Sequence, residues 1–144
     1  MSEPLIKIVR SKSDLNDAQN VRSGVFTVEQ GIDRSIEQDG FDDCCDHIVA
    51  YLEGEAVGTV RIHYISDQQA KIERLAVKAE TRGQKIGYKI MEKALNFLAE
   101  KNIKEIFLDS QYHAKSFYEK FGFKQIGDVF DEVGIVHVKM KKTL

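Results

Sequence analysis

A basic turn punctuated by glycine, "RGQKIG" at residues 82–87, carries the most specific chemistry in the sequence. An apolar stretch with Leu75, Ala76 and Val77 precedes it, and an amphipathic stretch follows it. The start of a helix leaves about four backbone N–H groups without partners and carries about half a positive charge. A glycine-containing turn at such a start can therefore bind phosphate.

The turn permits two interpretations. Gly83 and Gly87 would let a phosphate approach the backbone, and Arg82 and Lys85 would add positive charge. The segment lacks both the Walker A pattern G-x-x-x-x-G-K-[ST] and the dinucleotide pattern G-x-G-x-x-G. On these residues alone, a phosphate site and an ordinary strand-to-helix turn with surface lysines are equally good interpretations.

Length and composition limit the classes to which this protein can belong. The 144 residues favour one domain, and 42% hydrophobic with 31% charged residues is ordinary globular usage. A net charge of −2 gives no general attraction for nucleic acid or an acidic membrane surface. No signal-peptide core and no membrane-length apolar run occur, and the two cysteines are adjacent. We expect a single domain over residues 1–144, reduced and cytoplasmic, with no nucleic-acid or membrane partner.

Hydrophobic periodicity predicts the elements around the turn. Strands are expected at 5–9, 47–65 (a hairpin), 69–77 and 104–110 and as two strands after residue 123, with helices at 13–30, 84–102 and 113–123. The order strand, helix, strand over 69–110 implies one parallel crossover, and the remaining pairs should be antiparallel. The expected fold class is α/β of the mixed α+β kind.

The acidic segment 31–47 has no apolar period, so we expect a long loop. Its aspartates, two cysteines and His47 lack the spacing of zinc or EF-hand sites, and no metal is expected. The segment would either attract a cationic amine or be a solvated loop. Cys44 and Cys45 are expected to pack as buried residues.

Two segments resemble the GNAT superfamily of acyl-CoA-dependent N-acyltransferases, and three more resemble one of its subgroups. In "LAVKAETRGQKIG", Arg82 and Gly87 match the ends of its acetyl-CoA signature [RQ]-x-x-G-x-[GA], and Lys85 replaces the middle glycine. "AKSFYEKFGF" at 114–123 resembles its A-x-x-F-Y-x-x-x-G-F segment, with Gln111 where asparagine is usual. "RSGVFTVEQGI", "DGFDDCCDH" and "GIVHVKMKK" resemble the ElaA/YjcF-like subgroup, so the resemblance covers nearly the whole chain.

The resemblance implies a mostly antiparallel sheet of six to seven strands, splayed between strands 4 and 5, with about four helices. It implies transfer of acetyl from acetyl-CoA to an amine of a small-molecule or peptide acceptor by direct attack, in a monomer or homodimer. The alternative is a non-catalytic sensor or interaction module that binds CoA or a nucleotide. The residues that would contact acetyl-CoA are Leu75, Ala76, Val77, Arg82, Gly83, Gln84, Lys85, Ile86, Gly87, Tyr88, Gln111, Ala114, Phe117 and Tyr118.

Catalysis would need a proton acceptor for the amine and a proton donor for the thiolate. Glu73, just before the turn, is the first candidate base and Asp109 its rival. Glu73 would otherwise pair with Arg74 or a neighbouring strand. The resemblance places Tyr118 near the sulfur as general acid, the alternative being a core tyrosine, and makes the Val77 N–H the oxyanion donor.

Four residues in the subgroup-like segments are candidates for the acceptor pocket: Arg22, Glu29, Gln30 and His137. Arg22 could hold a carboxylate or phosphate of the acceptor. A surface or helix-pairing role is an equally good interpretation for each.

Overall fold

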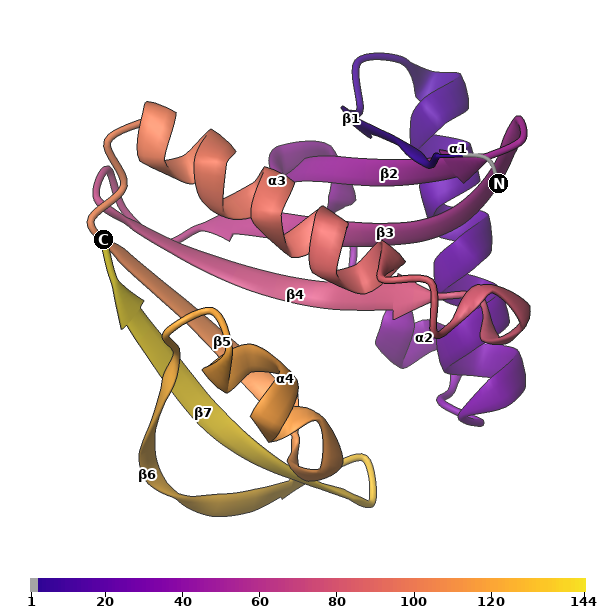
Figure 1. Cartoon of the computed structure of the whole chain (residues 1–144). Coiled ribbons are helices and arrows are strands. Elements are labelled where there is room, and N and C mark those ends of the chain that lie inside the picture. The colour runs from indigo at the N-terminus through magenta and orange to yellow at the C-terminus, as the bar shows by residue number, and fades with distance from the viewer. Residues whose placement is uncertain (1–2) are drawn as a thin grey trace.

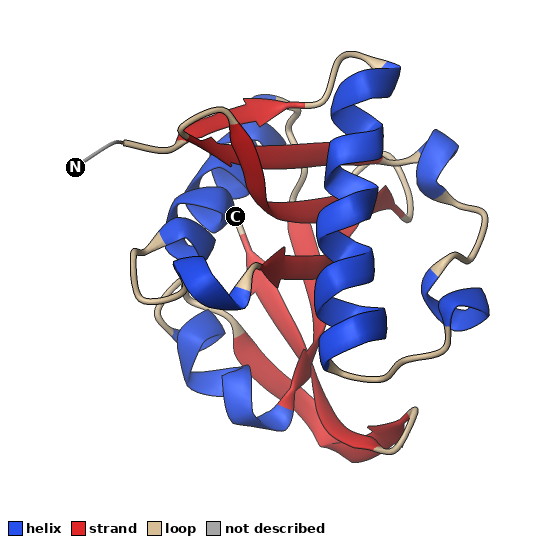
Figure 2. Cartoon of the chain, turned by 90° about the vertical axis from the view of Figure 1, so that its right-hand side faces the viewer, coloured by secondary structure: helices blue, strands red, loops and turns tan. Residues whose placement is uncertain are grey.

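The computed structural model describes residues 3–144 and contains one seven-stranded sheet of order β1-β2-β3-β4-β5-β7-β6. The strands are β1 (Leu5–Ile8), β2 (Asp46–Leu52), β3 (Glu55–Tyr64), β4 (Gln69–Val77), β5 (Glu105–Gln111), β6 (Lys124–Glu132) and β7 (Ile135–Thr143). The α-helices are α1 (Lys12–Arg22), α2 (Arg34–Glu37), α3 (Ile86–Glu100) and α4 (Lys115–Glu119). Helices lie on both faces of the sheet (Figures 1 and 2). The predicted mixed fold class is therefore confirmed.

The sheet opens between β4 and β5. This parallel pair is hydrogen-bonded only where residues 69–71 meet residues 105–107. Beyond that point the strands diverge, as Figure 1 shows, while β4 stays paired with β3 and β5 with β7. The predicted splay is confirmed, and it creates a wedge whose sides are two strand edges.

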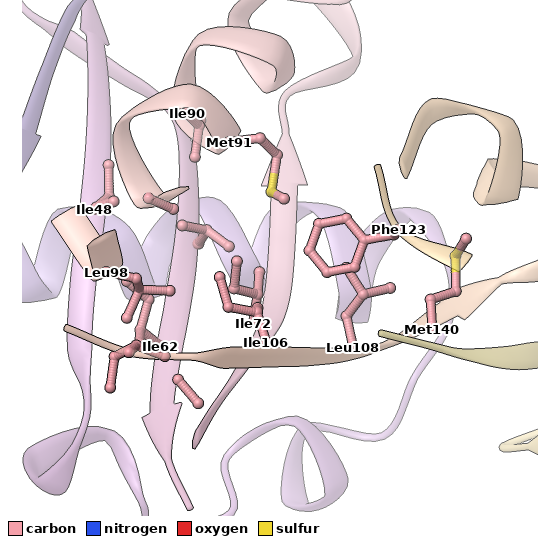
Figure 3. Packing of buried hydrophobic residues seen from close by; sticks show 14 of the residues in the cluster. Ile48, Ile62, Ile72, Ile90, Met91, Leu98, Ile106, Leu108, Phe123 and Met140 are labelled. Atoms are coloured by element: carbon pink, nitrogen blue, oxygen red, sulfur yellow. The ribbon is translucent and has the colours of Figure 1, made fainter. Parts of the chain in front are cut away.

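Helix α3 fixes the position of the glycine-containing turn. Its apolar stripe, with Ile90, Met91 and Leu98, packs on the sheet in the main core (Figure 3). Gly58 on β3 allows this close approach, because a Cβ there would lie 2.7 Å from the Ile90 side chain. The first residue of the helix is thereby anchored beside the end of β4.

The segment expected as one helix over 13–30 has two parts. Helix α1 starts at the Ser11 cap, whose hydroxyl accepts a hydrogen bond from the Asp14 N–H (3.1 Å). The chain then continues as the π-helix η1 (Ser23–Glu29). Val21 and Val25 pack on Ala76 of β4, on the face opposite α3. This packing brings the end of η1 to the open side of the wedge.

The segment 31–47 is more ordered than the sequence predicts. It contains α2 and a 3-10 turn, η2 (Asp42–Cys44). The expected burial of both cysteines is wrong for Cys44, which is exposed, while Cys45 is half-buried. Across residues 3–144, no helix combines the length and apolar character needed to cross a membrane.

Candidate active site

The wedge between β4 and β5 leads into a cleft of about 1400 Å³. Its walls come from the end of β4, the turn before α3, the end of β5 and helix α4. The residues expected to contact acetyl-CoA that line it are Leu75, Ala76, Val77, Arg82, Gly83, Lys85, Ile86, Gly87, Tyr88, Gln111, Ala114, Phe117 and Tyr118. Gln84 is absent from its lining.

A β-bulge interrupts β4 beside the wedge. Thr59 pairs with Ala76 but Arg61 pairs with Glu73, so β4 has one extra residue there. Arg74 has a φ of +60° within this bulge. A bulge leaves a residue outside the ladder and bends its strand. The bulge therefore releases backbone groups of β4 from sheet pairing at the place where the wedge opens.

The turn before α3 has the geometry of an anion site. Gly83 (φ +87°) and Lys85 (φ +62°) are both left-handed, and no side chain caps the helix. The N–H groups of its first turn are therefore open to a ligand. Lys85 adopts the conformation that glycine adopts without strain, at a cost of about 1–2 kcal/mol. Lys85 therefore replaces the middle glycine of the signature at the cost of backbone strain, and the turn stays open.

Arg82 of this turn is already paired. Its Nε donates to the Val77 carbonyl (3.0 Å), and its two terminal nitrogens donate to the Glu29 carboxylate (2.6 and 2.8 Å). These hydrogen bonds hold the pKa of Glu29 below its usual value. A residue expected at the acceptor pocket therefore contacts a residue expected at the phosphates.

Gln30, the residue after Glu29, makes a contact that crosses the wedge. The Gln111 side-chain amide, at the end of β5, donates to the Gln30 side-chain oxygen (3.0 Å). His113 Nε2 lies 2.7 Å from the Gln111 side-chain oxygen and donates to it. Together with the Glu29–Arg82 pair, this bond connects the end of η1 to both sides of the wedge.

Tyr118 lines the cleft from α4. Its ring makes edge contacts with Phe117 and Phe123, at centroid distances of 5.1 and 6.3 Å. Burial raises the pKa of its phenol above the usual value. Within residues 3–144 no hydrogen bond to its hydroxyl is found. A protonated, unpaired phenol in a cleft is suited to donate a proton.

The two carboxylates expected as bases are engaged in ion pairs. Glu73 Oε1 accepts from Arg61 Nε (2.9 Å) and Nη2 (2.7 Å), and His63 Nδ1 lies 3.3 Å from the same oxygen. Asp109 Oδ2 is 2.9 Å from Lys71 Nζ. Glu73 thus pairs with a neighbouring strand, as the alternative interpretation held, while Arg74 pairs elsewhere.

Three arginines neutralise the acidic segment. Arg22 binds Glu37 (2.7 Å) and Asp42 (2.8 Å), Arg61 binds Asp39, Asp42 and Glu73, and Arg74 binds Glu37 and Asp39. We call these seven residues the arginine network. Arg22 is only 1% exposed and does not line the cleft, contrary to its expected place in the acceptor pocket. Glu37, Asp39 and Asp42 belong to the segment expected either to attract a cation or to be solvated, and all three are bound internally.

His137, which was expected at the acceptor pocket, lines the cleft and is 7% exposed. Its Nδ1 donates to the Ile135 carbonyl (2.8 Å), and its Nε2 is 3.6 Å from Glu132 Oε2. Its ring stacks on Phe130 at a centroid distance of 5.7 Å. Glu132 was not predicted, because nothing in the β6–β7 sequence marks it apart from other surface acids.

One cluster could offer ligands to a metal ion. The ligand atoms of Cys44, Cys45 and His63 lie within 4.8 Å of one another. Cys44 is exposed, and burial raises the pKa of the Cys45 thiol to about 12.

Comparisons with known proteins identify the class. Residues 14–144 match the model of the acetyltransferase (GNAT) domain family. The chain is 32% identical to ElaA of Escherichia coli over 92% of this chain and 89% of ElaA. It is 31% identical to the uncharacterised N-acetyltransferase YjcF of Bacillus subtilis, over 94% and 96% of the two chains. The chain therefore belongs to the GNAT acetyltransferase family.

Solved structures agree with this assignment. The crystal structure of Escherichia coli ElaA superposes with a TM-score of 0.85 at 31% identity, covering 99% of each chain. An aminoglycoside 6'-N-acetyltransferase complexed with coenzyme A shares the fold, with a TM-score of 0.75 at 16% identity over 96% of each chain. The predicted resemblance to the ElaA/YjcF-like proteins is confirmed.

Proposed function

We propose that this protein transfers an acetyl group from acetyl-CoA to an amine. The main support for the proposal is that two structural features of this GNAT chain meet. These are the uncapped turn at residues 82–87 and the wedge between β4 and β5, which share one cleft. The fold it shares with an aminoglycoside acetyltransferase complexed with coenzyme A supports the same cosubstrate.

The turn would hold the pyrophosphate. Open N–H groups of the first turn of α3 would donate to its oxygens, and Arg82 and Lys85 would supply positive charge. The pantetheine arm would pair with the backbone of residues 75–77 like an added strand.

The chemistry would be a direct attack. The amine nitrogen bonds to the thioester carbonyl carbon, the carbon–sulfur bond breaks, and the Val77 N–H stabilises the oxygen. Tyr118 gives its proton to the leaving thiolate, which its raised pKa allows because the phenol stays protonated at neutral pH. The proton lost by the amine must be accepted on the opposite, acceptor side of the wedge.

A thermal-shift titration with acetyl-CoA, with ATP and NAD as controls, tests the binding step. At about 100 times the dissociation constant, acetyl-CoA should add about 2.7 kcal/mol to the free energy of unfolding. Absence of a shift would overturn the proposal. Free-thiol release with spermidine, glucosamine and lysine amide then tests transfer, and binding without release would indicate a sensor.

Tyr118→Phe separates binding from chemistry. It removes only the hydroxyl, so turnover should fall about 10- to 100-fold while the acetyl-CoA dissociation constant stays within twofold. Thiol release and isothermal titration measure the two quantities. Equal turnover in the variant and the wild type would remove Tyr118 from the mechanism.

A further inference from the structure

We propose that His137, and not Glu73 or Asp109, accepts the proton of the attacking amine, with Nε2 as the accepting atom and Glu132 as its partner. This inference rests on the acetyl transfer proposed above. It follows from the position of His137 along the wedge, from the hydrogen bond that fixes its ring, and from the state of the two rival carboxylates.

The strand register places His137 beside the reacting atoms. Lys71 of β4 pairs with Phe107 of β5, and Gln111 lies four residues further along β5. Because the bulge adds one residue to β4 over the same span, the β4 residue level with Gln111 is Ala76. Gln111 pairs directly with His137 of β7. His137 is therefore level with the middle of the β4 segment 75–77 that would hold the thioester. Glu73 lies two ladder positions deeper, about 7 Å toward the closed end of the wedge.

The side chains alternate so that His137 faces the acceptor. On β5, Leu108 and Ser110 are buried toward the core beneath α3 and α4, so Asp109 and Gln111 point to the opposite face. Paired residues of antiparallel strands share a face, which puts His137 on the side of Gln111. Tyr118, on α4, approaches from the core side. The proton acceptor and the proton donor thus lie on opposite faces of the wedge.

The hydrogen bond at Nδ1 prepares Nε2 for this role. The Ile135 carbonyl can only accept, so Nδ1 carries a hydrogen and Nε2 of the neutral ring has a free lone pair. Stacking on Phe130 holds the plane of the ring. When Nε2 takes a proton, the Glu132 carboxylate 3.6 Å away can receive it as a hydrogen bond. Glu132 acts through His137 and is a positioning residue.

The rival carboxylates are occupied. Glu73 Oε1 accepts two hydrogen bonds from Arg61, and Lys71 lies 3.9 Å from its other oxygen. Asp109 is bound by Lys71; its buried second oxygen lies 3.9 Å from Lys139 Nζ and has no hydrogen-bond partner within residues 3–144. Both carboxylates line the cleft, but each is already held by a cation, Glu73 by Arg61 and Asp109 by Lys71, which competes with an amine for the carboxylate. The lone pair of His137 Nε2 has no hydrogen-bond donor in residues 3–144 and lies in the lining of the cleft.

The step balances without another reactant. The acceptor enters as the neutral amine, an ammonium having first lost its extra proton to solvent. As the carbon–nitrogen bond forms and the carbon–sulfur bond breaks, Nε2 takes one proton from the amine nitrogen. Tyr118 protonates the thiolate, giving the amide and CoA. The imidazolium proton then returns through solvent to the Tyr118 phenolate, which restores both groups.

The test compares His137→Asn with Glu73→Gln and Asp109→Asn, using thiol release from acetyl-CoA with spermidine, glucosamine and lysine amide and with water alone. His137→Asn keeps a donor near Nδ1 but removes Nε2, so release should fall at least about 100-fold. The acetyl-CoA dissociation constant should stay within about twofold. Lys93→Gln, an exposed substitution on α3 outside the cleft lining, is the control.

Chemical rescue separates catalysis from structure. Added imidazole should restore at least about a tenth of the lost rate in His137→Ala, because the ring can enter the vacated site, and it should not accelerate Tyr118→Phe. Full activity of His137→Asn, or a larger loss in Glu73→Gln or Asp109→Asn, overturns the assignment alone. Failure of rescue assigns His137 a structural role and also overturns it. If the wild type releases no thiol with any amine or with water, both the proposed function and this inference are overturned.

Discussion

Two regions of the molecule pair arginine with carboxylate, with different consequences. In the arginine network, Arg22 and Arg61 are each 1% exposed and bind several carboxylates. At the mouth of the cleft, Arg82 is 44% exposed and binds the single carboxylate of Glu29, itself 40% exposed. The same ion pair therefore serves as a fixed support in one region and as an exchangeable contact in the other.

Burial explains the difference. Breaking a buried pair leaves an uncompensated charge and costs about 3–5 kcal/mol, whereas an exposed pair contributes about 0–1 kcal/mol. A phosphate could displace Glu29 from Arg82 at little cost. No ligand could do the same in the network, which connects the segment 31–47 to β3 and β4. The position of a guanidinium, and not its chemistry, determines whether it is free to bind a substrate.

The largest expected effect is that of Arg61→Met. The substitution leaves Asp39, Asp42 and Glu73 without their shared cation, so the free energy of unfolding should fall by about 3–5 kcal/mol. Urea unfolding without ligand measures it. Arg82→Met, the exposed counterpart, should change stability by no more than about 0.5 kcal/mol. Similar losses in both variants would abolish the distinction between the two regions.

Part of the stability that the protein loses in acid should come from the arginine network. Burial raises the pKa of Asp42, but hydrogen bonds from Arg22 and Gln19 outweigh it and lower the pKa to about 2. A lowered folded-state pKa contributes stability above the unfolded value of about 4, and this is lost as pH falls from about 4 to 2. Unfolding measured between pH 5 and 2 should therefore depend less steeply on pH in Asp42→Asn. An unchanged slope would contradict this origin, and Glu29→Gln is the exposed control.

Arg82→Gln should affect binding and spare stability. Loss of a charged donor to the phosphates should weaken acetyl-CoA binding about tenfold. Isothermal titration at two salt concentrations measures it, and the variant should show a weaker salt dependence. Lys93→Gln, an exposed substitution on α3 away from the cleft lining, is the matched control. Unchanged affinity in Arg82→Gln would place the phosphates elsewhere.

The smallest effect is expected for Glu29→Gln. Glu29 occupies Arg82 and carries the same sign of charge as the phosphates, so its neutralisation should tighten acetyl-CoA binding about two- to threefold. Competition against a fluorescent CoA analogue resolves a change of this size. Weaker binding would instead mean that Glu29 positions Arg82 for the phosphates.

Local patterns predicted most of the fold. The strand 69–77 has the expected bounds, and helix α3 differs from its prediction by two residues at each end. In both segments the periodicity of apolar residues matches the face that packs in the core. The turn at 82–87 was identified from its two glycines, its two basic residues and the helix that follows.

Long-range pairing was not predictable. Arg22 meets Glu37 fifteen residues on, and Arg74 meets Glu37 across 37 residues. Nothing in a stretch of charged residues shows which will be buried, so the acidic segment resembled a solvated loop. The π-helix η1 was missed for a similar reason, since its apolar spacing fits an α-helix nearly as well. These elements depend on tertiary contacts that only the folded chain brings together.

The opening of the sheet also bears on self-association. An unpaired strand edge on the rim of a sheet invites pairing with other chains and promotes aggregation. Here the unpaired edges of β4 and β5 face each other inside the cleft instead of facing outward. The backbone N–H and C=O groups of such an inward-facing edge can bind a narrow ligand. The opposite strand prevents a strand of a neighbouring protein from pairing with them.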